Sequence, residues 1–96
     1  VGPEVVIEWT TLSETDHAGF WVLRETWGRG LVPIHYRMIP GAGSDLRGAD
    51  YRVVDDGAPV RSTRYWIVDV DSSGLETRHG PFSAERAGSY ARGAGR

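Results

Sequence analysis

The sequence predicts an all-β domain, a sandwich of about seven short antiparallel strands in two sheets. Runs rich in Val, Ile, Trp, Tyr and Phe recur along the chain, and clusters of Gly, Pro, Asp and Ser separate them at intervals of roughly 8–12 residues. No run has apolar residues at helical spacing, which leaves strands as the repeated element. The 96 residues suffice for one domain with a single core.

The strongest fold signal lies in Arg64–Pro81, which predicts two strands joined by a turn. The first of these strands is apolar on both faces, with Tyr65 and Ile67 on one face and Trp66 and Val68 on the other. A strand of this kind is covered on both sides, so we place it in the middle of a sheet.

The chain begins with a strand and a loop. Glu4–Thr11 alternates so that Val5, Ile7 and Trp9 share one face, and Trp9 is the first expected core residue. Residues 12–19 are mostly polar and turn-forming types, which predicts a loop.

A second central strand is predicted at Phe20–Thr26. Its apolar residues again occupy both faces, with Phe20 and Val22 on one face and Trp21 and Leu23 on the other.

The middle of the chain predicts an edge strand followed by a surface connection. Val32–Ile39 is a short strand with Pro33 near its start, where a missing N–H donor is tolerated at a sheet edge. Residues 40–50 are rich in Gly and Asp and form a long connection, from which Leu46 is expected to point inward. Tyr51–Val54 is another short strand.

The last part of the chain changes character. A turn at residues 55–59 precedes the hairpin, and Phe82 and Ala84 lie on its closing strand. Residues 87–96 are almost entirely Gly, Ala, Ser and Arg, which bury too little apolar surface to offset the entropy of ordering. We therefore predict a domain over residues 4–85 and a flexible C-terminal linker or tail over residues 86–96.

Composition argues against several classes of protein. The formal net charge is -2 with acidic and basic residues mixed along the chain, so we expect no positive surface for nucleic acid. The absence of Cys removes disulfides, thiolate nucleophiles and cysteine-based zinc sites. No apolar run approaches the roughly 20 residues of a membrane span, and we expect no membrane insertion.

Several short motifs occur in a characteristic order over about residues 4–85. They are a Trp-containing strand followed by Ser-Glu and Ala-Gly-Phe (residues 6–20), Ile34 with Met38-Ile39-Pro40, Gly48-Ala49-Asp50-Tyr51 with Val53 and Asp55, Asp69-Val70-Asp71 with Gly74, and His79-Gly80-Pro81. In this order they resemble the fibronectin type III-like modules of bacterial secreted and cell-surface proteins.

The resemblance implies an immunoglobulin-like sandwich with Trp9, Phe20, Val22, Tyr65 and Ile67 facing the core. It implies a spacer or protein-interaction module of a larger bacterial protein, secreted or on the cell surface. The module would not be an enzyme, and the resemblance carries over no catalytic residue, metal ligand or cofactor. Partners would be neighbouring domains of the same polypeptide, another protein or a second copy of the chain.

The chain departs from the family pattern on the outer face of its two central strands. Where the family commonly has polar residues, this chain has Trp21, Leu23, Trp66 and Val68, an apolar set that we predict to form an interface. The competing interpretation is that arginine stems cover the rings and keep the domain monomeric. The arginines concerned are Arg24, Arg64 and Arg78.

A calcium-like spacing occurs at the predicted turn. Asp69, Asp71, Ser73 and Gly74 occupy the first, third, fifth and sixth positions of such a loop, but the twelfth position is Gly80. Because the bidentate carboxylate is missing and these residues are turn formers, a hairpin turn is the preferred interpretation.

Two further patterns contain residue types that are used in metal binding or catalysis. The histidines, His17, His35 and His79, lack a spacing that places two on one face, and zinc needs three or four converging ligands. The segment Ser13–His17 contains every residue type of a hydrolase triad, but side chains adjacent in a loop rarely reach one another productively. Local capping, with Glu14 folded back onto backbone donors, is the simpler interpretation.

A saccharide is the alternative ligand. The four Trp and four Tyr residues could line a groove in which flat rings stack on sugar faces. The alternative function is therefore a carbohydrate-binding module, against the simpler view that these rings serve core and interface contacts.

Overall fold

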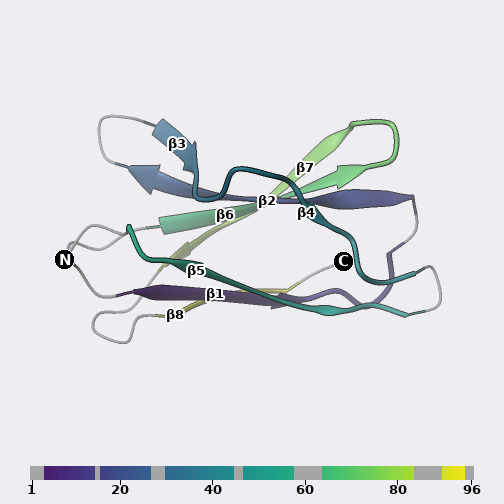
Figure 1. The fold of residues 1–96 in the computed structure, drawn as a ribbon, viewed down its shortest axis with the longest axis horizontal. Coiled ribbons are helices and arrows are strands. Elements are labelled where there is room, and N and C mark those ends of the chain that lie inside the picture. Colours follow the sequence, from purple (N-terminus) through teal and green to yellow (C-terminus); the bar gives the residue numbers. More distant parts are fainter. Residues whose placement is uncertain are drawn as a thin grey trace.

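The protein is described here from a computed structural model that covers residues 4–14, 16–26, 30–44, 47–57, 64–83 and 90–94. Within these residues the chain forms strands and no helix, and the strands lie in two stacked sheets (Figure 1). The strands are β1 (Val5–Thr10), β2 (His17–Thr26), β3 (Gly30–Pro33), β4 (Ile39–Pro40), β5 (Asp50–Asp55), β6 (Arg64–Asp71), β7 (Glu76–Ser83) and β8 (Tyr90–Ala94). No helix that could cross a membrane occurs in this part of the chain.

The two sheets differ in size. The smaller sheet has the order β5-β1-β8, and the larger has the order β3-β2-β6-β7, with β4 pairing to β2. All of these pairs are antiparallel except β1 with β8, which is parallel. The predicted all-β sandwich of two sheets is therefore confirmed, and the described residues form eight strands where about seven were predicted.

The β6–β7 hairpin forms where the sequence predicts it, and β6 lies between β2 and β7. Asp71 N donates to the carbonyl of Leu75 at 3.0 Å, and Gly74 N donates to the carbonyl of Asp71 at 3.0 Å. Gly74 has φ of 92°, a left-handed conformation that glycine adopts without a steric penalty. The turn residues therefore close the hairpin through their own backbone.

The core lies between the sheets and is centred on aromatic rings. Trp9 stacks on Tyr51 with ring centroids 5.2 Å apart and meets Phe20 edge-on at 5.3 Å. The five residues assigned to the core from the sequence are all at most 3% exposed. They are Trp9, Phe20, Val22, Tyr65 and Ile67.

The predicted edge strand Val32–Ile39 is wrong in its continuity. The structure has β3 and β4 separated by a bend over residues 34–37. Within that bend the His35 ring takes the place of a backbone acceptor, because Val22 N donates to His35 Nε2 at 2.9 Å. Because a side chain takes the hydrogen bond that a carbonyl of the neighbouring strand would otherwise accept, the backbone can leave the sheet at this point.

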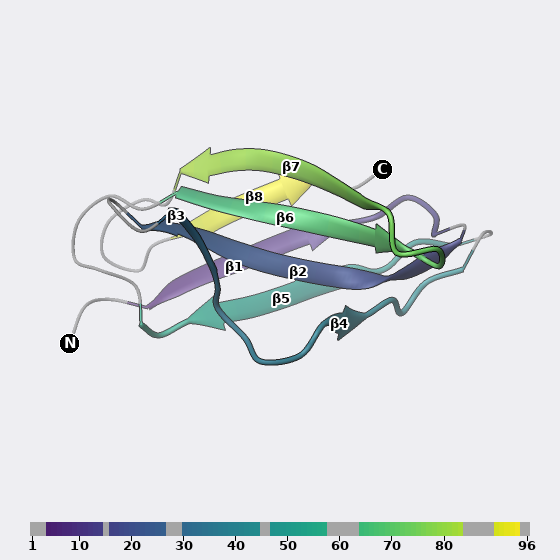
Figure 2. The same cartoon turned by 90° about the horizontal axis from the view of Figure 1, so that it is seen from above.

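The prediction of a flexible tail over residues 86–96 is wrong for Tyr90–Ala94, which form β8 beside β1 (Figure 2). Apolar burial is not the only contribution to ordering this segment, because the edge of β1 also offers a row of backbone donors and acceptors to an extended segment. The predictions for Leu46, Ala58, Pro59 and Ala84 lie outside the described residues.

Candidate functional site

A shallow groove lies on the outer face of the larger sheet, which faces away from the core. It has a volume of about 230 Å³ and takes its lining from four strands, β2, β3, β6 and β7. We call it the outer groove, and its lining residues are Trp21, Leu23, Pro33, Val68 and Glu76. Its floor and walls are apolar, with one carboxylate among the lining residues.

Strand register explains why these residues meet. The β2–β6 pair places Trp21 opposite Val68 and Leu23 opposite Trp66, and the β2–β3 pair places Pro33 opposite Leu23. Residues opposite each other in a sheet share a face, so the four residues predicted as an interface are neighbours. Trp66 is part of this neighbourhood, although it does not line the groove.

Burial corrects one part of the predicted interface. Trp21, Leu23 and Trp66 are half-buried, whereas Val68 is only 3% exposed. Val68 is the smallest of the four and lies on the central strand, with Trp21 opposite it on one side and Arg78 on the other. Val68 therefore forms the floor of the groove, and a partner would touch mainly its neighbours.

The two outer indoles are held by neighbouring side chains. Trp21 stacks on His35 with ring centroids 5.0 Å apart and planes within 9°. Trp66 Nε1 donates to Glu25 Oε1 at 3.0 Å, and Arg64 Nη2 forms an ion pair with Glu25 Oε2 at 2.5 Å. The hydrogen bond from Arg64, followed by that from Trp66, lowers the pKa of Glu25 below its ordinary value.

The competing interpretation, in which arginine stems cover the outer indoles, does not hold for Arg24. Arg24 shares the core-facing side of β2 with Val22, and its Nη1 lies 2.9 Å from both carboxylate oxygens of Asp55. Tyr65 OH also donates to Asp55 at 2.7 Å. Burial, followed by this bond to the carboxylate, raises the pKa of Tyr65. We call Arg24, Asp55 and Tyr65 the Asp55 cluster.

A second buried polar group lies at the other end of β1, around Glu14. Its Oε2 accepts from Thr11 Oγ1 at 2.6 Å and from Tyr51 OH at 2.5 Å, and its Oε1 accepts from Gly43 N at 3.2 Å. Burial alone would raise the pKa of Glu14, but these hydrogen bonds lower it below 4.5. Burial raises the pKa of Tyr51 to about 12, and the bond to Glu14 adds to this effect.

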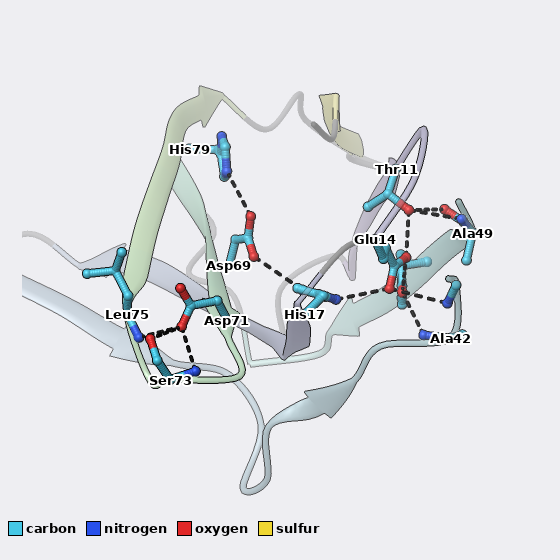
Figure 3. A network of polar contacts seen from close by, with 12 residues as sticks. Thr11, Glu14, His17, Ala42, Ala49, Asp69, Asp71, Ser73, Leu75 and His79 are labelled. Atoms are coloured by element: carbon cyan, nitrogen blue, oxygen red, sulfur yellow. Dashed lines mark hydrogen bonds and ion pairs between the residues drawn. The ribbon is translucent and has the colours of Figure 1, made fainter. Parts of the chain in front are cut away.

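His17 links Glu14 to the opposite sheet (Figure 3). His17 Nδ1 lies 2.9 Å from Glu14 Oε1, and Nε2 lies 3.2 Å from Asp69 Oδ1. His79 approaches the other oxygen of Asp69 at 3.7 Å. We call Thr11, Glu14, His17, Tyr51 and Asp69 the Glu14 cluster. It joins a loop, both sheets and three separate parts of the sequence.

Two glycines allow the loop after β4 to approach this cluster. A Cβ atom at Gly41 would lie 2.7 Å from His17 Nδ1, and one at Gly43 would lie 2.8 Å from Glu14 Oε2. Both distances are shorter than van der Waals contact, so a side chain at either position would push the loop away. The glycines therefore fit the loop closely over the buried charges.

The Glu14 cluster combines residue types used in catalysis, but its geometry is that of a buried link. The side chains of His17 and Asp69 are each 1% exposed, so a substrate has no path to the imidazole. Ser13, the nucleophile type of the weighed triad, makes no hydrogen bond to His17 among the described contacts. No group of His, Asp and Glu in the described residues is arranged to hold a metal ion.

The calcium-like residues are used by the turn itself. Asp71 Oδ1 accepts from Ser73 N at 2.9 Å, from Ser73 Oγ at 2.6 Å and from Leu75 N at 2.9 Å. These bonds, led by that from the Ser73 hydroxyl, lower the pKa of Asp71. Asp69 points instead to His17, so the two carboxylates do not converge.

Three of the six described Trp and Tyr rings proposed for sugar stacking lie inside the domain. Trp9, Tyr51 and Tyr65 are all at most 8% exposed, and Tyr36 is fully exposed but outside the groove. Trp27 and the Tyr90 side chain are outside what the structure describes. Trp21 is therefore the aromatic residue that the outer groove offers to a ligand.

Sequence reasoning missed both polar clusters. His17 and His79 meet at Asp69 although they are far apart in the chain, and Asp55 was assigned only to a turn. The alternation of each strand could have revealed them, because it places Arg24 and Asp69 on the same faces as buried core residues. A charged residue at such a position requires a partner.

Comparison of the chain with protein-family models, with curated proteins and with solved structures gives no match.

Proposed function

We propose that this chain is a non-catalytic, fibronectin type III-like module of a larger bacterial extracellular or surface protein. It serves as a spacer or protein-interaction domain, and the outer groove is its contact surface. The order β2-β6-β7 in one sheet and the pairing of β1 with β5 in the other support this proposal. They match the C-F-G and B-E neighbours of immunoglobulin-like sandwiches.

The outer groove is chosen as the contact surface because its apolar residues are gathered in one place. Trp21, Leu23 and Pro33 gather over a buried Val68 on a sheet face that points away from the core. Apolar surface gathered in one place on a domain commonly marks a covered interface, and aromatic side chains supply most of the energy of such contacts. The half-buried Trp21 is oriented by its stack on His35, which reduces the entropy lost when a partner binds.

The structure gives two of the three arginines other partners. Arg24 pairs with Asp55, and Arg64 pairs with Glu25. Arg78 lies opposite Val68 on β7, so it is the arginine that could still cover part of the groove. The contact surface that we propose is the remaining apolar lining.

The test compares two leucines. Leu23→Ser removes an apolar wall of the groove, whereas Leu12→Ser changes a leucine that is 80% exposed and outside it. Binding is measured by sedimentation and by titration against the adjoining domain of the parent polypeptide. The proposal expects Leu23→Ser to weaken association and Leu12→Ser to leave it unchanged, with both variants folded.

Equal association of both variants would remove the outer groove as the contact surface. A separate assay with insoluble polysaccharides addresses the carbohydrate alternative. The interaction module predicts no retention, and retention that Trp21→Ser abolishes would favour the carbohydrate-binding module instead.

A further inference from the structure

Strand β1 is paired very differently on its two sides. On one side β5 is antiparallel to it and places Tyr51 opposite Trp9 and Val53 opposite Ile7. On the other side β8 is parallel to it and places Gly93 opposite Trp9 and Ala91 opposite Ile7. The same two core residues thus have large neighbours on one side and the smallest residue types on the other.

The β8 pairing is the weaker of the two for physical reasons. The residue types that the register places opposite Ile7 and Trp9 are Ala and Gly, which together carry one methyl group and so offer little apolar surface. Parallel pairing is also slightly less stable per residue than antiparallel pairing.

Strand β1 itself is well suited to a stronger neighbour. Val5, Ile7 and Trp9 are each at most 3% exposed and face the core, while Val6, Glu8 and Thr10 alternate with them. The β5 side shows the chemistry that this strand accepts, an antiparallel segment with bulky apolar residues at alternate positions. A segment with those properties would bury more apolar surface than β8 does.

We propose that the β8 side of β1 is a strand-acceptor site, which β8 occupies until an extended segment of a partner polypeptide replaces it. The partner segment runs antiparallel to β1 and carries apolar residues opposite Ile7 and Trp9. A basic or neutral residue lies opposite Glu8, the position that Arg92 takes in β8. Backbone hydrogen bonds supply the affinity, and the alternate side chains supply the specificity. This surface is an edge of the small sheet, separate from the outer groove.

Full-length variants of β8 test the proposal in opposite directions. Ala91→Val with Gly93→Val strengthens β8 by placing apolar groups opposite Ile7 and Trp9. Ala91→Pro with Arg92→Pro weakens the pairing of β8. Successive N–H groups of a strand point to opposite sides, so one of two adjacent prolines removes a hydrogen-bond donor to β1. The probe is a short synthetic peptide in which valine alternates with threonine and arginine, and its control has the same sequence with N-methylated backbone amides.

We expect the proline variant to bind the peptide most tightly, the unaltered chain less tightly and the valine variant most weakly. When β8 occupies the site, the apparent affinity for the peptide falls in proportion to the fraction of chains in which the site is free. We therefore expect at least about a tenfold difference in affinity between the proline and valine variants. The N-methylated peptide should not bind, and amide exchange in β1 should slow only with the active peptide.

Three results would overturn the proposal. They are equal peptide affinity for both variants, no binding to the proline variant, and loss of the folded state in the proline variant by circular dichroism. The last result would show that β8 is an integral strand rather than a replaceable one.

Discussion

The two buried polar clusters lie at opposite ends of the same strands. Both link the two sheets, but through different kinds of side chain. Strands β2, β5 and β6 each supply one residue to the Glu14 cluster and one to the Asp55 cluster. These pairs are His17 and Arg24, Tyr51 and Asp55, and Asp69 and Tyr65. Each cluster therefore links the small sheet to the large one beyond the apolar core.

The clusters differ in the group that balances their carboxylates. Asp55 is paired with the Arg24 guanidinium and accepts a hydrogen bond from one phenol. Glu14 and Asp69 lie on either side of an imidazole, and a glycine-containing loop donates a further bond to Glu14. One end of the sandwich thus depends on an arginine–carboxylate ion pair, and the other on a network that includes an imidazole and a loop.

The largest effect should come from breaking the ion pair between Arg24 and Asp55. Asp55→Ala leaves the Arg24 guanidinium and the Tyr65 hydroxyl buried without their acceptor, and removing one partner of a buried pair costs about 3–5 kcal/mol. Chemical denaturation measures the loss. Asp50→Ala is the matched control, because the bond that Asp50 accepts from Thr10 is exposed to solvent. Similar midpoints for the two variants would mean that the Asp55 cluster does not link the sheets.

An intermediate effect should follow from removing the imidazole. His17→Leu keeps apolar bulk but removes the imidazole that is hydrogen-bonded to Glu14 and lies 3.2 Å from Asp69. A hydrogen bond to a charged group contributes about 1.5–3 kcal/mol. His79→Leu should cost less, since its Nε2 is 3.7 Å from Asp69. Equal losses for both histidines, measured by the same denaturation, would contradict the central position of His17.

The pH dependence should separate the clusters on the acid side. The folded pKa of Glu14 lies below 4.5, so the unfolded chain takes up the proton first as pH falls. The stabilisation is fully present above about pH 4.5 and is lost as pH drops through the folded pKa. Glu14→Gln should flatten this acid limb of the stability curve. If the acid limb of that variant kept its slope, the loss of stability at low pH would come from other groups.

The smallest expected effect is on the alkaline side. The pKa of Tyr51 is about 12 in the folded chain against 10.0 ordinarily, so the unfolded chain loses its proton first. The contribution is present below pH 10 and disappears as pH rises to about 12. Tyr51→Phe should therefore reduce the alkaline loss, and Tyr65, whose pKa is also raised, should account for the remainder. Spectroscopic titration of the phenols provides the measurement.

The sequence was sufficient for features that repeat locally. Alternation along one strand identified Trp9, Phe20 and Ile67 as core residues, and the same parity placed Trp21 and Leu23 on the outer face. Turn chemistry identified the hairpin at Asp71 and Gly74. Each of these inferences needs only neighbouring residues, because strand period and turn conformation are local properties.

The clusters and β8 could not be found in this way because they depend on distant partners. Glu14 meets Tyr51 across 37 positions and His17 meets Asp69 on another strand, and neither spacing has a local signature. Strand β8 forms although its residues have little apolar surface, because β1 supplies the ladder. Sequence period identified the faces of the sheets, whereas charge partners and edge pairing required the tertiary arrangement.

The chemical accessibility of His17 tests most directly whether the Glu14 cluster is a buried structural link, so that contacts with other molecules occur on the outside of the sandwich. Modification of histidines by diethyl pyrocarbonate, followed by mass spectrometry, measures this accessibility for each histidine in the native chain. We expect that His17, with a side chain 1% exposed, reacts only at the rate at which the domain unfolds. Reaction of native His17 as fast as in the unfolded chain would contradict it and would reopen the cluster as a site for chemistry.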